Sequence, residues 1–554
     1  MTFLDNIFGK LDGVEDTVLW ELHDQSATNK VSWGVTGPGL LRRISQVRSY
    51  LVSRNFKRGD RCALLAANGI DWIAVDLAIM AEGLIVVPLY SRQAPGELVA
   101  MMKDCSPSLI CCGDAALRDS IVQIWPEAPP QALFEEIFAS PVSILRKPKV
   151  HDSDIVAIIY TSGTSGEAKG VMLTAGNIGH ILQCTSGQLD ILMKHRAGQD
   201  RVYQWAPLNF AAAWITTLTS LLRGSSVFMN TDLSKLAGEL RAVAPDYFVN
   251  VPALLERVRK AVDEQLWKTA GVVRTIYLKA KAAYMRRQEG KATFSDSIWL
   301  AAANAGVFPT IRKKMIGANL KALICGSAPL SVETQLFFMM LGIPVLQVYG
   351  LTETTAICTL DDPHHVEPGR VGPAISGIEM KVAENNEIVV RGPNIFPGYW
   401  NRPDETAKVL RDGWFHTGDQ GEVNAAGNWK IVGRIKNLII LNSGHNIAPE
   451  PIEDEILAHL PSAQFAVVIG NGRSYLSLLI TGDVSDQQVQ SALDAVNPTL
   501  PHYKQLRAFR VIKEPFTTEN GLLTANGKLK RDLIAQRFQP QIEEMYTVKQ
   551  SSTA

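Results

Sequence analysis

Short apolar runs rich in β-branched residues alternate with amphipathic segments along the first two thirds of the chain. The apolar runs predict strands at 61–67, 84–87, 109–112, 155–160, 247–251, 320–325 and 345–349. The amphipathic segments between them predict helices at 70–81, 253–262 and 331–341. Strands that alternate with helices are typical of parallel sheets covered on both faces. The sequence therefore predicts an α/β architecture.

The pattern changes near residue 370. Short strands and Gly/Pro turns then follow closely, with strands predicted at 387–391 and 428–432, which indicates a β-rich module. After residue 434 a compact α+β pattern begins. It predicts helices at 449–460 and 485–496 and strands at 465–469, 475–481 and 508–512. We therefore expect a domain boundary near 433–437, with an N-terminal domain at 1–433 and a C-terminal domain at 434–554.

The longest apolar tract, at 72–90, is interrupted by Asp76, Glu82 and Gly83. Two acids and a helix-breaking glycine do not suit a membrane span, so we predict a buried helix followed by a strand. The N-terminal segment MTFLDNIFGKLDG has neither a basic start nor a long apolar stretch. It therefore does not resemble a signal peptide.

The stretch 263–318 is predicted to be helical and is locally basic. Between residues 265 and 291 it carries one acid, Glu289, and interleaves basic with aromatic residues: Trp267, Lys268, Arg274, Tyr277, Lys279, Lys281, Tyr284, Arg286, Arg287 and Lys291. One interpretation is a solvated helical hairpin. The other is an amphipathic surface at 265–291 that associates peripherally with anionic membrane lipid.

Composition narrows the class of protein. The 554 residues include 55 Lys plus Arg and 55 Asp plus Glu, and this zero net charge disfavours a dedicated nucleic-acid binder. A hydrophobic share of 46% with a charged share of 20% indicates a globular protein of several domains. The seven cysteines form no C-x-x-C pair, so we expect a reducing, cytoplasmic location without a disulfide framework or a zinc site. The sequence carries no indication of an oligomeric state.

The strongest local signal for chemistry is the segment YTSGTSGEAKG at 160–170, directly after a predicted strand. Glycines, hydroxyls and Lys169 can present backbone N–H groups, side-chain donors and a cation to phosphate oxygens. A flexible turn is the alternative, because glycine and serine favour turns. The segment is not a P-loop, since Lys169 is followed by Gly170. The sequence also lacks a G-x-S-x-G elbow and an H-E-x-x-H helix, which disfavours serine hydrolases and zinc proteases.

The segment resembles the phosphate-binding signature of the adenylate-forming superfamily, which includes acyl-CoA synthetases. Four further motifs similar to that superfamily follow in the expected order: YGLTE at 349–353, WFHTGD at 414–419, GRIK at 433–436 and TANGKLKR at 524–531. Residues 68–90 are similar to its N-terminal region. The stretch 263–318, followed by 320–329, most resembles long-chain fatty acyl-CoA synthetases. Each motif alone can arise by chance, whereas five in order are specific.

The resemblance implies a large multi-subdomain N-terminal body, with doubly wound sheets and a distorted β-barrel module, and a small mobile α+β C-terminal domain. It implies activation of a long-chain fatty acid by ATP to acyl-AMP and pyrophosphate, then transfer to the CoA thiol to give acyl-CoA and AMP. ATP, Mg²⁺ and coenzyme A are therefore the expected small-molecule partners. Because the carboxylate and ATP are both anions, such a site needs cations between them.

The resemblance also implies site residues. The outer phosphates of ATP are assigned to Thr161, Ser162, Gly163, Thr164, Ser165, Gly166 and Lys169. The adenosine and the α-phosphate are assigned to Gly326, Ser327, Ala328, Tyr349, Gly350, Thr352, Asp419 and Arg434. Within that set Tyr349 is expected to stack on adenine, and Asp419 to accept the ribose hydroxyls with support from Arg434. The expected catalytic residues are Lys528, Glu353, Thr352 and Lys169, with Glu353 as the Mg²⁺ ligand and Lys528 bridging the carboxylate and the α-phosphate.

A hinge is implied at Lys436. After adenylation the C-terminal domain is expected to rotate, so that Lys528 leaves and a pantetheine tunnel forms near Ser443, Gly444 and His445. Taken singly, Lys528 is equally typical of a solvated loop, and Glu353 and Asp419 of helix caps or turns. The joint order of the motifs favours the catalytic interpretation.

Several positions depart from the superfamily's pattern. Phe210 stands where a histidine is frequent, Ala168 replaces a proline, and Asn437 replaces an aspartate. None of these changes removes an expected catalytic group. The segment 209–215 has small alanines that leave room for an acyl chain, with Phe210 and Trp214 as expected pocket walls. Ordinary helix packing explains the same segment equally well.

Alternatives to an acyl-CoA ligase remain open at this point. The acyl group can pass to a carrier protein, the reaction can stop at acyl-AMP, or the acid can be short or aromatic. A non-catalytic lipid-binding scaffold on the same fold is the alternative from another class.

Overall fold

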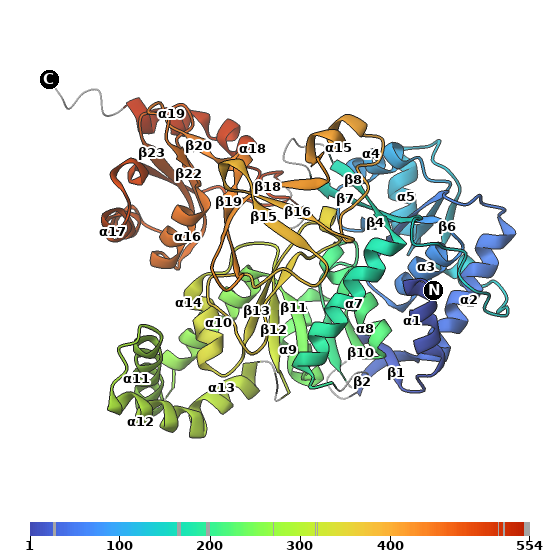
Figure 1. The fold of residues 1–554 in the computed structure, drawn as a ribbon, viewed down its shortest axis with the longest axis horizontal. Coiled ribbons are helices and arrows are strands. Elements are labelled where there is room, and N and C mark those ends of the chain that lie inside the picture. Colours follow the sequence, from blue (N-terminus) through green and yellow to red (C-terminus); the bar gives the residue numbers. More distant parts are fainter. Residues whose placement is uncertain are drawn as a thin grey trace.

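We describe the structure from a computed structural model of the chain (Figure 1). It describes residues 1–25, 29–162, 168–195, 200–269, 271–315, 317, 319–518, 520–524 and 527–547. Of the predicted site residues, Gly163, Thr164, Ser165 and Gly166 lie outside this part of the chain, and only the backbone of Ser162 is described.

The first sheet has six strands in the order β6-β5-β3-β4-β7-β8. Its strands are β3 (Arg61–Ala66), β4 (Ile85–Tyr90), β5 (Leu109–Cys112), β6 (Gln131–Leu133), β7 (Ile155–Ser162) and β8 (Ala168–Thr174). All neighbours are parallel except β7 and β8, which form an antiparallel hairpin.

The second sheet has eight strands in the order β14-β13-β12-β11-β9-β10-β1-β2. They are β1 (Thr17–Gln25), β2 (Asn29–Thr36), β9 (Arg201–Gln204), β10 (Ser226–Asn230), β11 (Tyr247–Asn250), β12 (Ala322–Cys325), β13 (Val345–Tyr349) and β14 (Thr359–Leu360). The middle strands are parallel, and antiparallel strands form both edges.

Helices cover both faces of both sheets, which confirms the predicted α/β architecture. One core lies between the sheets, around α1 (Phe3–Asp12), α2 (Gly37–Ser53), α3 (Ile70–Ala81), α7 (Ala175–Leu192) and α8 (Ala211–Arg223). The other face of the six-stranded sheet packs on α4 (Pro95–Cys105) and α5 (Ala115–Ile124), and α6 (Phe134–Phe138) lies near its edge. The other face of the eight-stranded sheet packs on α9 (Leu236–Val243), α10 (Pro252–Trp267) and α14 (Val332–Met340).

The tract at 72–90 forms a buried helix and a strand, as predicted. Helix α3 has the predicted bounds, and each of its residues except Asp71 is buried. Gly83 ends this segment with a φ of +76°, a conformation that glycine adopts without strain. Strand β4 follows at once, so this apolar tract belongs to the protein core. Within the part of the chain that the structure describes, no helix is long and apolar enough to span a bilayer.

A helical lobe projects from the body at the lower left of Figure 1. It contains the end of α10, α11 (Gly271–Gln288), α12 (Phe294–Ala302), a π-helical turn (Ala303–Val307) and α13 (Phe308–Met315). The described part of 263–318 is thus largely helical.

The β-rich module is an antiparallel five-stranded sheet made of β15 (Glu379–Val382), β16 (Glu387–Arg391), β17 (Leu410–Arg411), β18 (Trp414–Val423) and β19 (Trp429–Arg434). Helix α15 (Pro403–Val409) precedes β17. The pairing runs from β15 through β16 to β18, which also pairs with β17 and β19. The β-rich module predicted after residue 370 is thus present, and among the described strands no pairing joins β15 to β19.

The C-terminal unit follows β19. A short pair, β20 (Ile439–Ile440) and β21 (Asn446–Ile447), precedes a sheet of β22 (Ala463–Ile469), β23 (Leu476–Gly482) and β24 (Leu506–Ile512). Its helices are α16 (Glu450–His459), α17 (Asp486–Val496), α18 (Arg531–Arg537) and α19 (Gln539–Thr547). This unit has two apolar cores of its own. A small α+β C-terminal domain was predicted, and the structure shows it.

Candidate active site

Residues of three parts of the chain meet beyond the carboxyl ends of β12 and β13. Tyr349 ends β13, Asp419 lies in β18 of the β-rich module, and Arg434 ends β19. Lys528 comes to the same place from the C-terminal unit. Ligands of parallel sheets commonly bind at this edge, so the topology itself brings these predicted residues into one site.

Asp419 is the centre of this group. One carboxylate oxygen, Oδ2, accepts a hydrogen bond from the Tyr349 hydroxyl at 2.8 Å, and Oδ1 lies 2.8 Å from Arg434 Nε. Strands β18 and β19 pair Asp419 with Arg434 directly. Burial raises the pKa of Asp419, while Arg434, Tyr349 and Lys528 oppose that shift. Each carboxylate oxygen has a second lone pair, so Asp419 can still accept further donors.

Lys528 is held by a tight turn. Its backbone N–H donates to Thr524 Oγ1 at 3.1 Å, and Thr524 N–H donates to the Lys528 carbonyl at 2.8 Å. Lys528 is solvent-exposed, yet the surrounding protein lowers the pKa of its ammonium, first by partial desolvation and then through the charge of Arg434. Asp419 and Glu353 act in the opposite direction. The ammonium therefore lies in the electrostatic field of Asp419 and Glu353, the residues predicted to bind the ribose and Mg²⁺.

Glu353 follows β13 in a short 3-10 helix, η3 (Thr352–Thr354). The Tyr399 hydroxyl donates to Glu353 Oε1 at 2.8 Å, and Phe396 N–H donates to its carbonyl at 2.9 Å. These two contacts orient the side chain, and Glu353 Oε2 has no hydrogen-bond partner among the described residues. The Glu353 side chain is half-buried, and one of its carboxylate oxygens is unengaged. It can therefore supply one ligand to a hard cation such as Mg²⁺, whose other ligands would come from phosphate and water.

Both flanks of the predicted loop at 160–170 are strand residues, in β7 and β8. Thr161 pairs with Lys169 across the β7–β8 hairpin, and the hydroxyl of Thr161 lies 3.5 Å from the Lys169 carbonyl. The other edge of β8 is covered as well, because Trp400 N–H donates to the Gly170 carbonyl at 2.8 Å. A Cβ on Gly170 would lie 2.8 Å from the Ile158 side chain. Residues 168–170 thus belong to a strand that is paired on both edges, whereas residues 163–167 lie outside the described part of the chain.

Lys169 points to partners that are remote in sequence. Its ammonium lies 2.5 Å from Glu405 Oε2 and 5.1 Å from the centre of the Tyr399 ring. Hydrogen bonds from Lys169 and then Lys408 lower the pKa of Glu405 to about 2. Without a nucleotide, Glu405 is therefore an anionic partner of Lys169.

The turn after β13 requires glycine at position 350. A Cβ there would lie 2.2 Å from the Ala356 carbonyl oxygen. Thr355 and Ala356 have φ values of +53° and +87°, which are strained for non-glycine residues. This tight turn holds Thr352 and Glu353 beside the end of β13.

The segment Gly326-Ser327-Ala328 follows β12 next to this turn. Gly326 N–H donates to the Asn250 carbonyl at 3.3 Å, and Ser327 has a φ of +76°. The backbone that was predicted to lie along the edge of adenine thus lies beside β13, the strand that ends at Tyr349.

The hinge position Lys436 lies in a 3-10 helix, η5 (Ile435–Asn437), directly after β19. Asn437 Nδ2 donates to Glu450 Oε1 at 2.6 Å, and Glu450 Oε2 is buried without a partner among the described residues. An aspartate at 437 would instead bring two carboxylates together. The departure at Asn437 therefore has a structural reason in this chain.

Ser443, Gly444 and His445 form the exposed turn between β20 and β21. Ser443 Oγ lies 2.9 Å from His445 Nδ1, and the His445 ring stacks on Tyr503 at 4.2 Å. These contacts lie within the C-terminal unit. The structure does not bring this turn together with Tyr349, since no contact joins them among the described residues.

The expected acyl-pocket residues Phe210 and Trp214 line neither of the two cavities described below. Phe210 is the residue before α8 and is partly buried. Trp214 is 1% exposed, and its indole N–H donates to Asp76 Oδ2 of α3 at 2.9 Å. Trp214 is therefore a core residue, because its side chain points to α3 between the sheets.

A cavity of about 50 Å³ lies on the opposite side of α8. Ala212 and Ile215 of the predicted segment line it, together with residues of α7 and of the strands β11, β12, β13 and β14. Its walls are mostly apolar. The segment 209–215 thus contributes to a cavity, but through residues other than Phe210 and Trp214.

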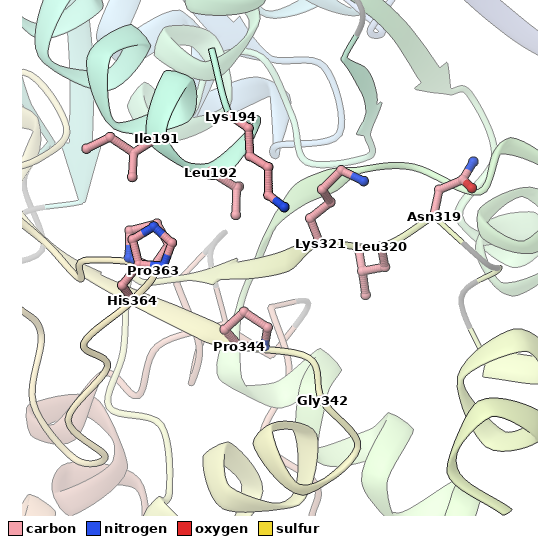
Figure 2. A pocket seen from close by; sticks show the side chains of 10 residues that line it. All are labelled: Ile191, Leu192, Lys194, Asn319, Leu320, Lys321, Gly342, Pro344, Pro363 and His364. Atoms are coloured by element: carbon pink, nitrogen blue, oxygen red, sulfur yellow. The ribbon is translucent and has the colours of Figure 1, made fainter. Parts of the chain in front are cut away.

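A larger, open pocket of about 440 Å³ adjoins this cavity and shares Leu192 and Pro363 with it. Figure 2 shows Lys194 and Lys321 beside the opening, with His364 on another wall. This pocket lies at the amino ends of β12 and β13, away from the edge with Asp419 and Lys528.

Sequence reasoning missed Tyr399, Glu405 and Glu450. Each of them acts on a predicted residue that is distant in sequence, and none lies in a motif that indicates chemistry. Their proximity to the predicted site residues becomes visible only in the fold. The sequence therefore carries no local signal for Tyr399, Glu405 or Glu450.

Comparison with known families agrees with this geometry. The family model described as AMP-binding enzyme matches residues 26–400, and the model described as AMP-binding enzyme C-terminal domain matches residues 436–550. The first match alone covers more than half of the chain, so the protein belongs to the AMP-binding enzyme family. The predicted membership in the adenylate-forming superfamily is confirmed.

Individual relatives are distant. The chain is 27% identical over 542 residues to the long-chain-fatty-acid–CoA ligase FadD15 of Mycobacterium bovis, covering 90% of this chain and 89% of the relative. The crystal structure of the anthranilate CoA ligase AuaEII with anthranoyl-AMP superposes with a TM-score of 0.75 at 18% identity, covering 97% of each chain. The adenylation domain of a carboxylate reductase from Mycobacterium chelonae gives 0.77 at 20% identity, covering 99% of this chain and 91% of that one. At these identities the two structures establish the fold.

Proposed function

We propose that the protein is an ATP-dependent acid–thiol ligase for a long-chain fatty acid. The carboxylate attacks the α-phosphorus of ATP, and the bond to pyrophosphate breaks to give acyl-AMP. The CoA thiol then attacks the acyl carbon, forming the thioester and releasing AMP. The observation that carries this proposal is the convergence of Lys528, Asp419, Arg434 and Glu353 from three parts of the fold.

The first half-reaction needs cations between two anions. Lys528 is proposed to bridge the attacking carboxylate and the α-phosphate, since the same ammonium can neutralise both. Lys169 is proposed to exchange Glu405 for the outer phosphates. Glu353 is proposed to hold Mg²⁺, which would offset phosphate charge when bound. Thr352, next to Glu353, is proposed to contact the α-phosphate.

The adenosine is proposed to bind at the ends of β12 and β13. Asp419 would accept the ribose hydroxyls through its remaining lone pairs, with Arg434 beside it. The Tyr349 ring and the backbone of residues 326–328 would contact adenine. The Tyr349–Asp419 hydrogen bond supports this arrangement, because it fixes both side chains before the nucleotide binds.

The second half-reaction is proposed to require rotation of residues 434–554 about Lys436. In the observed arrangement Lys528 lies in the field of Asp419, which suits adenylation, whereas the described contacts of Ser443 and His445 lie within the C-terminal unit. Rotation would exchange these two surfaces and use one site for both steps. The stack of His445 on Tyr503 supports a structural or CoA-contacting role for His445.

The fatty-acid assignment draws on the name of the FadD15 relative and on the mostly apolar cavity beside α8. The experiment is pyrophosphate exchange into ATP with short, medium, long and aromatic acids, followed by product assays with CoA and with a phosphopantetheinylated carrier protein. Long-chain acids and CoA are expected to be preferred. Transfer to the carrier alone would favour the acyl-AMP ligase alternative, and absence of exchange with every acid would contradict both.

We further propose that the helical lobe binds anionic lipid peripherally. Several of its large apolar side chains face solvent: Trp267 is 65% exposed, Val272 72%, Ile298 57% and Phe294 86%. Residues 294, 298, 301, 302 and 305 are all exposed at helical spacing and are apolar. The same lobe carries the basic residues of 265–291, and Arg274 lies over the Trp267 ring at 5.2 Å. Apolar insertion flanked by cations suits an anionic bilayer surface.

Vesicle binding tests this lobe. Vesicles containing phosphatidylglycerol are expected to bind the protein at low salt, and pure phosphatidylcholine to bind it weakly. Trp267→Ser with Phe294→Ser is expected to abolish most binding, whereas Ile144→Ser, which removes an equally exposed side chain elsewhere, is not. Equal binding by both variants, or no binding at low salt, would contradict the proposal.

A further inference from the structure

The cavity between α7, α8 and the eight-stranded sheet has a few polar side chains in mostly apolar walls. One of them is Asp361, whose Oδ2 accepts a hydrogen bond from the Gln347 N–H at 2.8 Å. Most of its lining is aliphatic, including Leu189, Ile215, Ile324, Leu346 and Val348. Helices α7 and α8 pack side by side, to the right of β11 in Figure 1. Such a cavity would by itself suit an unsubstituted hydrocarbon chain.

Two residues of α7 depart from this pattern. Thr185 and Gln188 both line the cavity, and Thr185 Oγ1 and Gln188 Oε1 are buried without a hydrogen-bond partner among the described residues. They are three positions apart, so they lie on one face of the helix. A buried polar atom left unpaired destabilises the protein, and proteins rarely leave two such atoms together.

The polar lining of α8 differs in this respect. Thr216 lines the same cavity, but its hydroxyl donates to the Ala212 carbonyl at 2.7 Å. Its single O–H donor is therefore already used within the helix. The unmet capacity belongs to Thr185 and Gln188, which makes Thr216 a matched reference for them.

We propose that this cavity selects acids whose chain carries a hydroxyl group, with Thr185 and Gln188 as the specificity-determining residues. The proposal rests on the proposed ligase function, whose acyl chain would occupy this cavity. A hydroxyl can donate to Gln188 Oε1 and accept from the Thr185 hydroxyl at the same time. A single substituent would thus satisfy both unpaired atoms.

An unsubstituted chain cannot do this. If water fills the polar region before binding, the chain must displace it and leave both atoms unpaired. If the region is dry, the atoms stay unpaired. In both cases the hydroxy acid binds more favourably than the unsubstituted acid. Sites that hydrogen-bond a substrate hydroxyl discriminate strongly against analogues that lack it.

The position of the pair along the cavity indicates where the hydroxyl lies. Val348, Ala356 and Ile357 line the cavity near the turn that holds Glu353, and Leu192 is shared with the open pocket of Figure 2. Gln188 precedes Leu192 by four residues, or about 6 Å along the helix. The hydroxyl is therefore expected away from the carboxyl group, and the rest of a long chain would continue into the open pocket.

The test compares kcat/KM for pyrophosphate exchange between unsubstituted straight-chain acids and length-matched monohydroxy acids that differ in hydroxyl position. For the wild type, one range of positions distant from the carboxyl group is expected to exceed the unsubstituted acid by about tenfold or more. Thr185→Val with Gln188→Met, which keep shape and remove polarity, is expected to reverse the preference. Thr216→Val is expected to keep the wild-type ratio.

Two results would overturn the inference: a wild type that prefers the unsubstituted acid at every hydroxyl position, or a double variant that keeps the wild-type ratio. If the double variant fails to fold, the ratio is measured on each single variant with the same criteria. Exchange with unsubstituted acids alone would remove this inference and leave the ligase function standing. Exchange with no acid would remove the proposed function itself.

Discussion

Asp76 is a buried acid whose ionisation should weaken the region around α3 and α8. It is 1% exposed, its Oδ2 accepts only the Trp214 indole N–H, and its Oδ1 has no partner among the described residues. Burial raises the pKa of Asp76 from 3.8 to about 7, although the Trp214 hydrogen bond opposes this. Because α8 also supplies Ala212 and Ile215 to the cavity, this region supports the proposed acyl site.

The sign of the effect follows from linkage. Above about pH 4 the unfolded chain has an ionised Asp76, whereas the folded chain keeps it protonated up to about pH 7. Stability from this group is therefore present at pH 4 and is lost as the pH rises to 7. At about 1.4 kcal/mol per pKa unit the whole loss is about 4 kcal/mol, of which about 3 kcal/mol falls between pH 5 and pH 8.

The perturbation is Asp76→Asn, which keeps the shape and can accept the Trp214 N–H at every pH. The assay is hydrogen exchange of the slowest amides of α3 and α8, corrected for intrinsic rates, because it reports local opening in a multidomain chain. Relative to the wild type, protection in the variant is expected to increase about 100-fold between pH 5 and pH 8. Asp12→Asn, on the exposed face of α1, is expected to show no such change.

An unchanged ratio of protection between Asp76→Asn and the wild type at the two pH values would refute this reasoning. It would mean that the protonation state of Asp76 is the same in the folded and the unfolded chain between pH 5 and pH 8.

Three further predictions concern other parts of the site and the C-terminal unit. Glu405→Gln should lower KM for ATP about fivefold, because a partly exposed ion pair with Lys169 is worth about 1 kcal/mol and would no longer compete with phosphate. Gly350→Ala should lower adenylation about 100-fold in pyrophosphate exchange, since its Cβ would displace the turn that holds Thr352 and Glu353, the proposed catalytic residues. Arg531→Met should destabilise the C-terminal unit by about 3 kcal/mol in denaturation monitored by hydrogen exchange, because Glu453 would stay buried without its cation.

Each of these has a contrary outcome. A higher KM for ATP in Glu405→Gln would mean that Glu405 assists phosphate binding. Normal exchange activity in Gly350→Ala would show that the turn can move without loss. Unchanged protection of α16 in Arg531→Met would show that Glu453 finds another partner or becomes protonated without penalty.

The alternation of strands and helices was predictable because it depends on local patterns. Helix α3 is an example: its apolar residues, with Gly69 before and Gly83 after, define a buried segment without reference to the rest of the chain. The order of the motifs likewise predicted that Asp419, Arg434 and Lys528 share one site, and the structure brings them together.

The direction of side chains was not predictable. Trp214 and Ile215 are neighbours on α8, yet Trp214 points to Asp76 between the sheets and Ile215 points into the cavity. Both helix faces are buried in a layered fold, so hydrophobicity alone does not distinguish a core position from a pocket wall.

Long-range pairing also overrode local preference. Residues 168–170 were predicted as part of a loop, but they pair with β7, and Trp400, far away in sequence, covers the other edge of β8. Glu405 reaches Lys169 across a similar separation. Such contacts depend on how the β-rich module packs on the six-stranded sheet, which no local pattern of residues encodes.

The central claim is that Lys528 serves adenylation and not thioester formation. The measurement is a pair of assays on Lys528→Ala, with Lys530→Ala as the matched neighbour: pyrophosphate exchange with a long-chain acid, and thioester formation from supplied acyl-AMP and CoA. We predict that Lys528→Ala loses exchange by about 100-fold or more and keeps thioester formation, while Lys530→Ala keeps both. Exchange at the wild-type level in Lys528→Ala, or an equal loss of both half-reactions, would contradict the claim.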